Sequence, residues 1–218
     1  MFSAKAEPAR DCGHCARLAT FRREAREREP DWFNAPVPPF GDTSARLLVI
    51  GLAPGLQGAN RTGRPFTGDH AGELLYSTLR EYGFAQGVYA ARPDDGLRLV
   101  DATIINAVRC VPPQNKPQPE EIARCRPFLE AAIAEMPRLR AIAALGRIAH
   151  DSVVRAFGGR LTAYPFAHGA EFPIGTERHL TLFDSYHCSR YNTNTRVLTP
   201  DMFRAVFARV RKTLDDAR

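Results

Sequence analysis

The sequence predicts an α/β protein, a three-layer α/β/α sandwich with a four-stranded, mostly parallel central sheet. Two observations support this fold class. Four short apolar runs alternate along the chain with longer segments of helical periodicity, and such alternation favours a parallel sheet with helices on both faces. The chain has 218 residues, of which 44% are hydrophobic, and this is enough for one sizeable core. We therefore expect a single domain over residues 1–218.

The predicted elements follow one another in the order that this fold requires. A first helix, residues 11–28, carries CGHC at its start, and the proline-rich residues 29–42 are expected to be irregular. The four strands are expected within residues 45–53, 99–110, 141–146 and 178–189. The remaining helices are expected at residues 72–84, 118–136, 147–158 and 199–217. The turn-rich residues 159–175 predict no regular element.

Single residues mark the ends and faces of these helices. Gly83 is expected to stop the helix at 72–84. One face of that helix is predicted to carry Leu74, Leu75, Leu79 and Tyr82. Thr199 suits the N-cap of the last helix, with Pro200 at its first position.

Charge and the absence of long apolar runs limit the function classes. The formal net charge is +6 at pH 7, which favours a polyanionic partner such as nucleic acid, although only weakly. Arginines 22, 23, 26 and 28 alternate with glutamates and predict a solvated helix face. No apolar run reaches the ~18 residues of a membrane span, and the N-terminus lacks the apolar core of a signal peptide. We expect a cytoplasmic monomer with no membrane association.

The cysteines indicate a metal site. Cys12 and Cys15 form a C-x-x-C motif, Cys110 ends a predicted strand and Cys125 lies in the helix that follows. Four thiols in two pairs, in a reducing compartment, suit a four-thiolate site. The spacing leaves an iron–sulfur cluster and zinc both open, and Cys110 and Cys125 could also be ordinary buried thiols. Cys188 is expected to pack within its loop.

Three polar segments follow predicted strands. The first, GLAPGLQGANRTGRPFTGD at residues 51–69, contains neither a P-loop nor a tight G-x-G-x-x-G motif. The other two are NAVRCVPPQNKP and SYHCSRYNTNT. Ligands of parallel sheets bind beyond the carboxyl ends of the strands, so we expect these segments to converge on an active site.

These segments, together with CGHCARLATFR near the N-terminus, resemble the iron–sulfur uracil-DNA glycosylases. The likeness is greatest to the fifth family, often called type B, and it runs from about Cys12 to the final helix. Leu52 stands where the fourth family has a glutamate. The resemblance implies a [4Fe–4S] cluster held by Cys12, Cys15, Cys110 and Cys125, with zinc as the alternative. It also implies a cluster-binding segment at about residues 11–40.

The resemblance implies a monofunctional DNA glycosylase that hydrolyses the N-glycosidic bond of uracil flipped out of DNA, starting base excision repair. Its partner is DNA containing uracil or other deaminated bases, with hypoxanthine and xanthine as further candidates. No lysine is placed as a Schiff-base nucleophile, so no lyase step is expected. The alternative is a non-catalytic iron–sulfur or zinc module that binds DNA.

Residue roles follow from the same resemblance. The backbone at Gly51 and Ala53 would approach the base closely. Phe66 would stack on uracil, the alternative being a plain core aromatic. Asn106 would pair with the N3 and O4 edge of the base, the alternative being a loop cap.

Two further side chains are assigned to the chemistry. His187 would donate a hydrogen bond to uracil O2 and stabilise charge that develops in the transition state. Asp69 would take the place of the acidic or amide group that many relatives carry after the first glycine. Its alternative role is the N-cap of the helix that follows.

The segment after the last strand is expected to contact DNA through Ser189, Arg190 and Tyr191. Relatives have His-Pro-Ser-Pro where this chain has HCSR, and Tyr191 falls at the position of the side chain that fills the gap left by the flipped base. The candidate contacts to the phosphate backbone are Arg61, Arg64, Arg109 and Lys116.

Overall fold

The computed structural model is built around a sheet of six strands in the order β1-β5-β2-β6-β8-β7. The structure describes residues 1–175 and 179–216. Its central strands, which are parallel, are β5 (Ala102–Asn106), β2 (Leu47–Gly51), β6 (Ala141–Leu145) and β8 (Thr181–Ser185). The antiparallel edge strands are β1 (Phe40–Gly41) and β7 (Glu171–Pro173). The mostly parallel four-stranded core is confirmed, and two short edge strands extend it.

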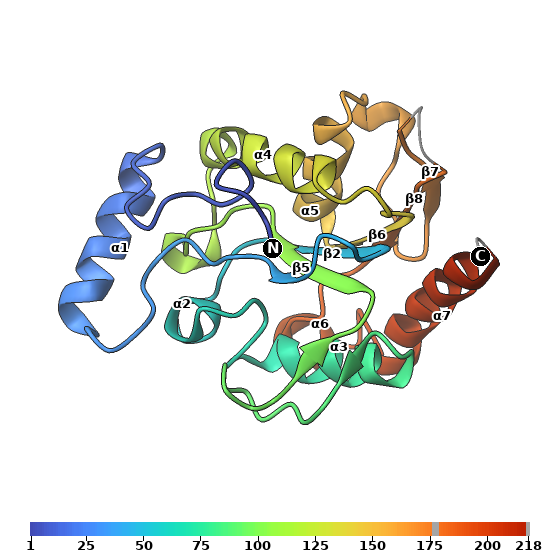
Figure 1. Ribbon diagram of the computed structural model, residues 1–218, viewed down its shortest axis with the longest axis horizontal. Coiled ribbons are helices and arrows are strands. Elements are labelled where there is room, and N and C mark those ends of the chain that lie inside the picture. The colour runs from blue at the N-terminus through green and yellow to red at the C-terminus, as the bar shows by residue number, and fades with distance from the viewer. Residues whose placement is uncertain (176–178, 217–218) are drawn as a thin grey trace.

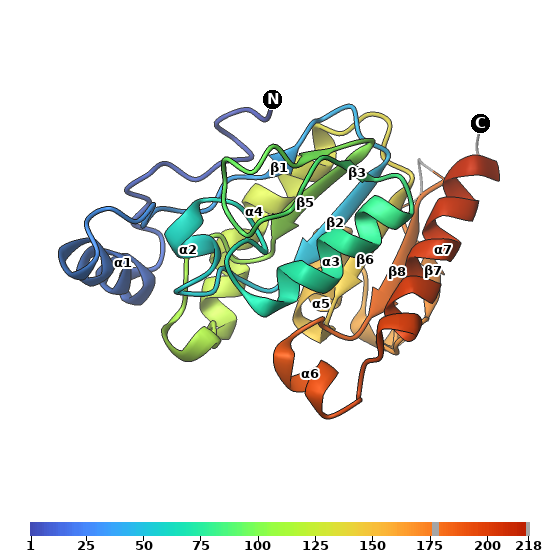
Figure 2. The same ribbon diagram turned by 90° about the horizontal axis from the view of Figure 1, so that it is seen from below.

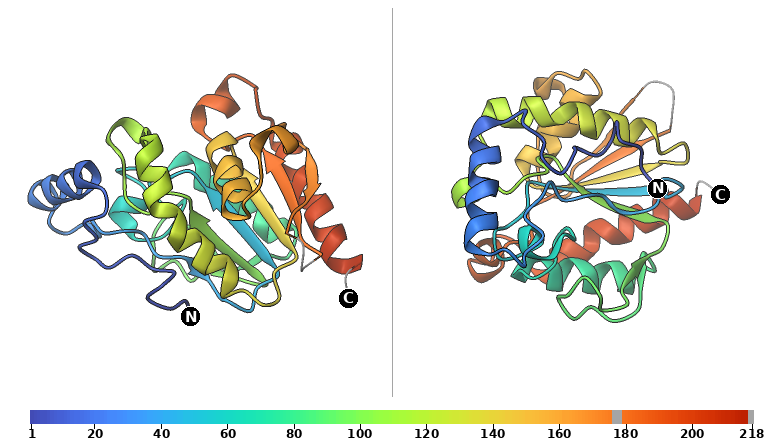
Figure 3. Two further views of the ribbon diagram at one scale, coloured as in Figure 1. Left: turned by 90° about the horizontal axis from the view of Figure 1, so that it is seen from above. Right: turned by 60° about the vertical axis from the view of Figure 1, so that its left-hand side comes forward.

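Helices cover both faces of this sheet, as the right-hand view of Figure 3 shows. One face is covered by α3 (His70–Glu81) and α7 (Pro200–Asp216), and the other by α4 (Pro119–Ala134) and α5 (Arg147–Ala156). The shorter helical elements are α2 (Ala59–Thr62), η1 (Pro113–Asn115), η2 (Leu161–Ala163) and α6 (Arg190–Asn194). A small hairpin consists of β3 (Ala85–Gln86) and β4 (Arg98–Leu99).

The apolar runs become central strands because both of their faces are covered. Along β2, Leu47 and Val49 join the core beneath α3 and α7, while Leu48 and Ile50 join the core beneath α4 and α5. This alternation is the period of two that a strand imposes. Strands that are buried on both sides need continuous apolar sequence, which is why the sequence revealed them.

The helix ends match most of the predictions. Thr199 caps α7, since its Oγ1 accepts a hydrogen bond from the Met202 backbone N–H at 3.2 Å. The buried face of α3 differs from the prediction, because Tyr76 is buried in place of Leu74 and Tyr82, which are only half-buried. Residues 178 and 217, which fall within predicted elements, lie outside the described residues.

The N-terminal helix α1 (Ala16–Arg28) lies at one end of the sandwich, beside α2 and α4 (Figures 1 and 2). Arg17 forms an ion pair with Glu121 of α4 at 2.7 Å. Asn34, just after α1, accepts a hydrogen bond from the Asn60 side chain of α2 at 2.8 Å. These contacts join the N-terminal segment to α4 and to the loop after β2.

Candidate active site

One cavity of about 770 Å³ opens at the carboxyl edge of the parallel strands. Its wall combines the loop after β2, the end of β5 and the segment after β8. The predicted residues that line it are Ala53, Phe66, Asp69, Asn106, His187, Ser189 and Arg190. Segments that lie far apart in the sequence therefore meet in one place, as the ends of parallel strands require.

Glycines in the loop after β2 allow the cavity side chains to approach its backbone. A Cβ atom on Gly51 would stand 2.5 Å from Asn106 Oδ1 and 2.6 Å from Phe66 Cζ. A Cβ atom on Gly58 would stand 2.5 Å from Asp69 Oδ2. A larger residue at either glycine would thus displace a side chain of the cavity.

The ring of Phe66 stacks against the ring of His187, with 5.9 Å between centroids and 25° between planes. Phe66 is 6% exposed and belongs to the core beneath α3, yet it also lines the cavity. Its φ is +52°, a conformation that is rare for a bulky residue. The ring therefore forms one flat wall of the cavity.

His187 lies two residues beyond β8 at the cavity wall. Burial lowers the pKa of His187 to about 4, so the imidazole is neutral near pH 7. Its ring makes no hydrogen bond to any residue that the structure describes, while its backbone carbonyl accepts one from Asn192 Nδ2 at 2.8 Å. A neutral imidazole still has one N–H to donate.

Asn106 is the last residue of β5 and pairs in register with Gly51. The residue is 3% exposed and lines the cavity. Its side-chain amide makes no loop-capping hydrogen bond within the described part of the chain. One donor group and one acceptor face the cavity together.

Asp69 occupies the N-cap position of α3, yet its carboxylate makes no capping hydrogen bond. Its Oδ1 atom is buried and has no partner among the described residues. Burial raises the pKa of Asp69, and the nearby amides of Gly72 and Ala71 and the charge of His70 offset part of this rise. The position therefore agrees with the helix-cap alternative, whereas the free carboxylate oxygen does not.

The cavity rim carries the segment after β8. Ser189 is the N-cap of α6 and accepts a hydrogen bond from the Asn192 backbone N–H. Arg190 is exposed, and Tyr191 projects into solvent with 74% of its surface accessible. An aromatic side chain this exposed at a cavity rim is available to a partner.

Three polar side chains that line the cavity were not singled out from the sequence: Gln57, His70 and Asn115. Gln57 belongs to the loop after β2 and Asn115 to the segment after β5. Their position within those polar segments was the signal that could have identified them. His70 directly follows Asp69 and contacts Thr193 Oγ1 of α6 at 3.3 Å. It joins the two sides of the cavity rim.

Two of the four basic residues expected at the DNA surface are buried, and that expectation is wrong for them. Arg64 is 5% exposed and forms an ion pair with Asp95 at 2.7 Å. Arg109 is 1% exposed, and its Nε donates to a backbone carbonyl at 2.7 Å. Arg61 and Lys116 are exposed. Sequence alone does not separate an arginine that serves the interior from one that faces solvent.

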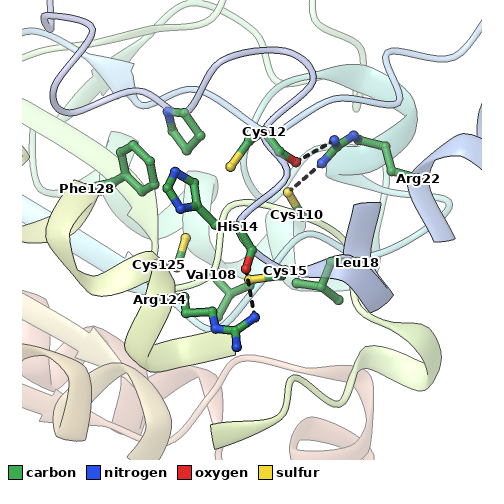
Figure 4. Close-up of a pocket in the computed structure, with 11 residues that line it drawn as sticks. Cys12, His14, Cys15, Leu18, Arg22, Val108, Cys110, Arg124, Cys125 and Phe128 are labelled. Carbon is green, nitrogen blue, oxygen red and sulfur yellow. Dashed lines mark hydrogen bonds between the residues drawn. The ribbon is translucent and has the colours of Figure 1, made fainter. Parts of the chain in front are cut away.

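A second, small pocket gathers the four predicted ligands. Figure 4 shows the sulfur atoms of Cys12, Cys15, Cys110 and Cys125 directed toward one shared space. All five cysteines are free thiols. Cys188 lies apart, fully buried in the core, which confirms its role in packing.

Backbone and guanidinium N–H groups contact two of these thiols. Arg22 Nη1 donates to Cys110 Sγ at 3.1 Å, and the Arg109 backbone N–H donates to Cys125 Sγ at 3.3 Å. Burial raises the pKa of Cys110 to about 11 and that of Cys125 to about 12. Arg22 is 3% exposed, so the predicted solvated face of α1 is wrong at this residue.

The donor set was compared with the two metal centres that the sequence left open. No group of three or more His, Cys, Asp or Glu side chains within residues 1–175 and 179–216 is arranged to hold a single metal ion. The four donors are all thiols, and N–H groups directed at sulfur are a feature of iron–sulfur sites. Four thiols are the donor set of [4Fe–4S] clusters and also of four-thiolate zinc sites, so the residues present suit either group.

Comparison with known proteins agrees with this fold and cavity. The Uracil DNA glycosylase superfamily matches residues 38–211 of the chain, which makes the protein a member of that superfamily. The type-5 uracil-DNA glycosylase of Thermus thermophilus is 46% identical over 92% of this chain and 93% of its own length. The type-5 uracil-DNA glycosylase of Pyrobaculum aerophilum is 36% identical over 91% of this chain and 87% of its own length. The chain belongs to the type-5 family.

A type-4 relative is more distant. The type-4 uracil-DNA glycosylase of Sulfurisphaera tokodaii is 29% identical over 78% of this chain and 72% of its own length. Because the type-5 relatives named above are more similar to this chain than this type-4 relative is, the identities agree with the predicted resemblance to the fifth family. Within the described residues, no helix is long and apolar enough to cross a membrane.

Proposed function

We propose that this protein is a monofunctional uracil-DNA glycosylase, which flips uracil out of DNA and hydrolyses its N-glycosidic bond to start base excision repair. The observation that carries the proposal is the meeting of Phe66, Asp69, Asn106 and His187 in one cavity at the carboxyl edge of the sheet. They come from three separate segments, and together they supply a flat wall, an amide, a neutral imidazole and a carboxylate.

Base binding begins with stacking. Extruding a nucleotide costs about a few kcal/mol of stacking and pairing, and stacking on an aromatic ring returns about 1–3 kcal/mol per base. The buried ring of Phe66 provides this surface. The amide of Asn106, which has no partner among the residues that the structure describes, then pairs with the N3–H and O4 of the uracil edge.

The chemical step separates charge. The bond between C1′ and N1 breaks, its electron pair leaves with the uracil, and the sugar becomes an oxocarbenium-like cation. His187, neutral because burial lowers its pKa, donates a hydrogen bond to uracil O2, where the negative charge develops. Asp69 faces the sugar as a carboxylate, offsets the cation and accepts a proton from the water that attacks C1′.

The DNA contacts extend from the cavity rim. Arg190, which is exposed, would contact a phosphate, and Ser189 caps the start of α6. Tyr191, which is exposed, fills the gap that the flipped base leaves in the stack. Hypoxanthine and xanthine are further candidate bases, because a cavity of about 770 Å³ has the size of pockets that hold larger ligands.

The four cysteines hold a [4Fe–4S] cluster in this proposal. The convergence of four thiols and the N–H groups directed at Cys110 and Cys125 support it, and zinc is the alternative. The cluster would link the N-terminal segment to the strand-end loops as a structural group. A brown protein with a broad visible absorption shoulder is expected, and a colourless protein with stoichiometric zinc would overturn the assignment.

The test of the proposal uses an end-labelled duplex with a single uracil. Incubation with the purified protein, followed by alkali, should cut the labelled strand at the uracil position. Without alkali the strand should stay intact, because no lyase step is expected. A duplex with thymine at that position is the control. Salt-sensitive DNA binding without base release would favour the non-catalytic module instead. Cytoplasmic localisation and a monomeric state stay predictions.

A further inference from the structure

Residues 65–67 carry Phe66 and are held by side chains from behind the cavity. Tyr76 of α3 donates its hydroxyl to the Pro65 carbonyl at 2.6 Å. Tyr89 donates its hydroxyl to the Phe66 carbonyl at 3.1 Å. Two phenol groups therefore fix consecutive carbonyl groups of the segment that presents the stacking ring.

The conformation that these bonds hold is one that Phe66 does not favour. With a φ of +52°, Phe66 lies in the left-handed region, where a bulky side chain is strained. Such a residue persists only when its surroundings restrain it. α3 approaches this segment closely at Gly72, where a Cβ atom would overlap the Phe66 carbonyl oxygen and Tyr89 Oη.

Tyr89 is held in turn by a buried ion pair. Arg64 donates Nη1 and Nη2 to the two carboxylate oxygens of Asp95, at 2.8 and 2.7 Å. The side chains are 5% and 0% exposed. Asp95 also accepts hydrogen bonds from the backbone N–H groups of Ala90 and Leu97, at 2.9 and 3.0 Å. One carboxylate thus shapes the hairpin loop that places Tyr89.

Aromatic rings surround the guanidinium group of this pair. The Arg64 Cζ atom lies 5.3 Å from the ring centroid of Phe40, 5.6 Å from that of Tyr76 and 5.8 Å from that of Tyr89. A guanidinium over aromatic faces is stabilised by cation–π attraction. Arg64 also donates Nε to Thr67 Oγ1 at 2.7 Å, so it contacts the Phe66 segment and the hairpin at once.

We propose that Tyr89 and the Arg64–Asp95 ion pair are positioning residues, which hold the Phe66 ring in the orientation that stacks on the flipped base. The inference rests on the proposed glycosylase function and adds a specific support for its base-binding wall. Arg64, Tyr89 and Asp95 are not among the residues that line the cavity. The proposal gives the hairpin between β3 and β4 a role in the site, which is to support Phe66.

The first experiment is a double-mutant cycle on uracil excision with Tyr89→Phe and Phe66→Leu. Tyr89→Phe keeps the ring and removes only the hydroxyl that bonds the Phe66 carbonyl. We expect kcat/KM to fall about tenfold, mostly through a higher KM. If Tyr89 acts through Phe66, the second substitution cancels this effect, and the double variant equals Phe66→Leu alone. If the losses of kcat/KM from the two single substitutions multiply in the double variant, the proposal is overturned.

A second measurement does not depend on activity. Hydrogen exchange by mass spectrometry should show faster exchange around residues 65–68 in Tyr89→Phe and in Asp95→Asn. The matched control is Asp101→Asn, since Asp101 forms a similar ion pair with Arg46 at 2.6 Å, away from the cavity. The control should leave exchange at residues 65–68 and uracil excision unchanged.

The outcomes separate the two hypotheses. A wild-type protein that releases no uracil contradicts the proposed function, while the exchange data still decide whether the hairpin holds Phe66. Unchanged exchange at residues 65–68 in both variants would overturn the positioning role, even if uracil excision is robust.

Discussion

In the cavity, Asp69 Oδ1 is buried without a hydrogen-bond partner among the described residues. The amide of Asn106 faces the same cavity and has no partner among these residues either. On α5, by contrast, both ring nitrogens of the buried His150 have partners. Its Nδ1 lies 2.8 Å from Asp184 Oδ1, and its Nε2 lies 2.8 Å from the Tyr164 carbonyl oxygen. Asp184 Oδ2, like Asp69 Oδ1, is buried without a partner among the described residues. The contrast therefore lies between the imidazole of His150, which has a partner at each nitrogen, and the cavity groups, which have none among these residues.

The difference separates groups that serve a substrate from groups that serve the fold. A buried polar group without a partner costs free energy, and Asp69 Oδ1 is the cavity atom to which this cost applies among the described residues. A buried pair behaves differently, because removing one partner leaves the other unpaired in the interior and lowers stability. Substitutions in the cavity should therefore act mainly on activity, whereas substitutions of the His150–Asp184 pair should act mainly on stability.

The largest effect on stability is expected at Asp184. Asp184→Ala leaves the buried ring of His150 without its carboxylate, and breaking a buried pair costs about 3–5 kcal/mol. The midpoint of urea unfolding should fall accordingly. Asp31→Ala, at an exposed position, is the control and should change stability by less than about 0.5 kcal/mol. An unchanged midpoint for Asp184→Ala would remove the contrast between the two regions.

The largest effect on activity is expected at His187. His187→Ala removes the donor to uracil O2, and the loss of one such donor lowers the rate by about 100- to 1,000-fold. Single-turnover excision of uracil measures this. Binding to a duplex without uracil serves as the control and should be unchanged, because the imidazole faces the cavity. A rate close to that of the wild type would assign the ring to packing against Phe66.

A smaller effect is expected at Asn106. Asn106→Ala removes the amide that pairs with the uracil edge, and a good bidentate pair contributes about 1–3 kcal/mol of base discrimination. The ratio of kcat/KM for uracil over a mismatched thymine should fall by about 10- to 100-fold. The free energy of unfolding should be little changed, since the amide bonds no residue in the described part of the chain. Unaffected excision would contradict the recognition role.

The smallest effect is a pH-dependent gain in stability at Asp69. Because burial raises the folded-state pKa of Asp69, the folded protein binds this proton more tightly than the unfolded chain does. Ionised Asp69 therefore destabilises the fold, and the cost appears as pH rises through its folded-state pKa. Asp69→Asn should be more stable than wild type by about 1 kcal/mol at pH 7. The difference should shrink as pH is lowered toward 4, and a constant difference would contradict it.

Much of the fold could be predicted because the signals are local. β2, β5 and β6 are buried on both faces, so each needs a continuous apolar run that any reader of the chain can find. β1 and β7 escaped prediction, since strands of two or three residues pair through backbone groups and need no side-chain pattern. The β3–β4 hairpin escaped for the same reason.

The cavity could also be anticipated in outline. Phe66, Asn106 and His187 follow predicted strands, and parallel strands direct their carboxyl ends to one edge. The order of the sheet and the packing of the helices decided the rest. Arg64 and Arg109 look like surface arginines in the sequence, and their burial depends on carbonyl and carboxylate partners far along the chain.

By itself, the sequence determined the strand and helix periodicity, the cysteine spacing and the residues that stand at strand ends, because each depends on neighbours within a few positions. Tertiary structure alone decided which polar groups have partners. Asp69 keeps a free oxygen, Arg22 contacts a thiol and Tyr89 holds the Phe66 carbonyl. Hydrogen bonds of this kind join residues that only the folded chain brings within about 3 Å.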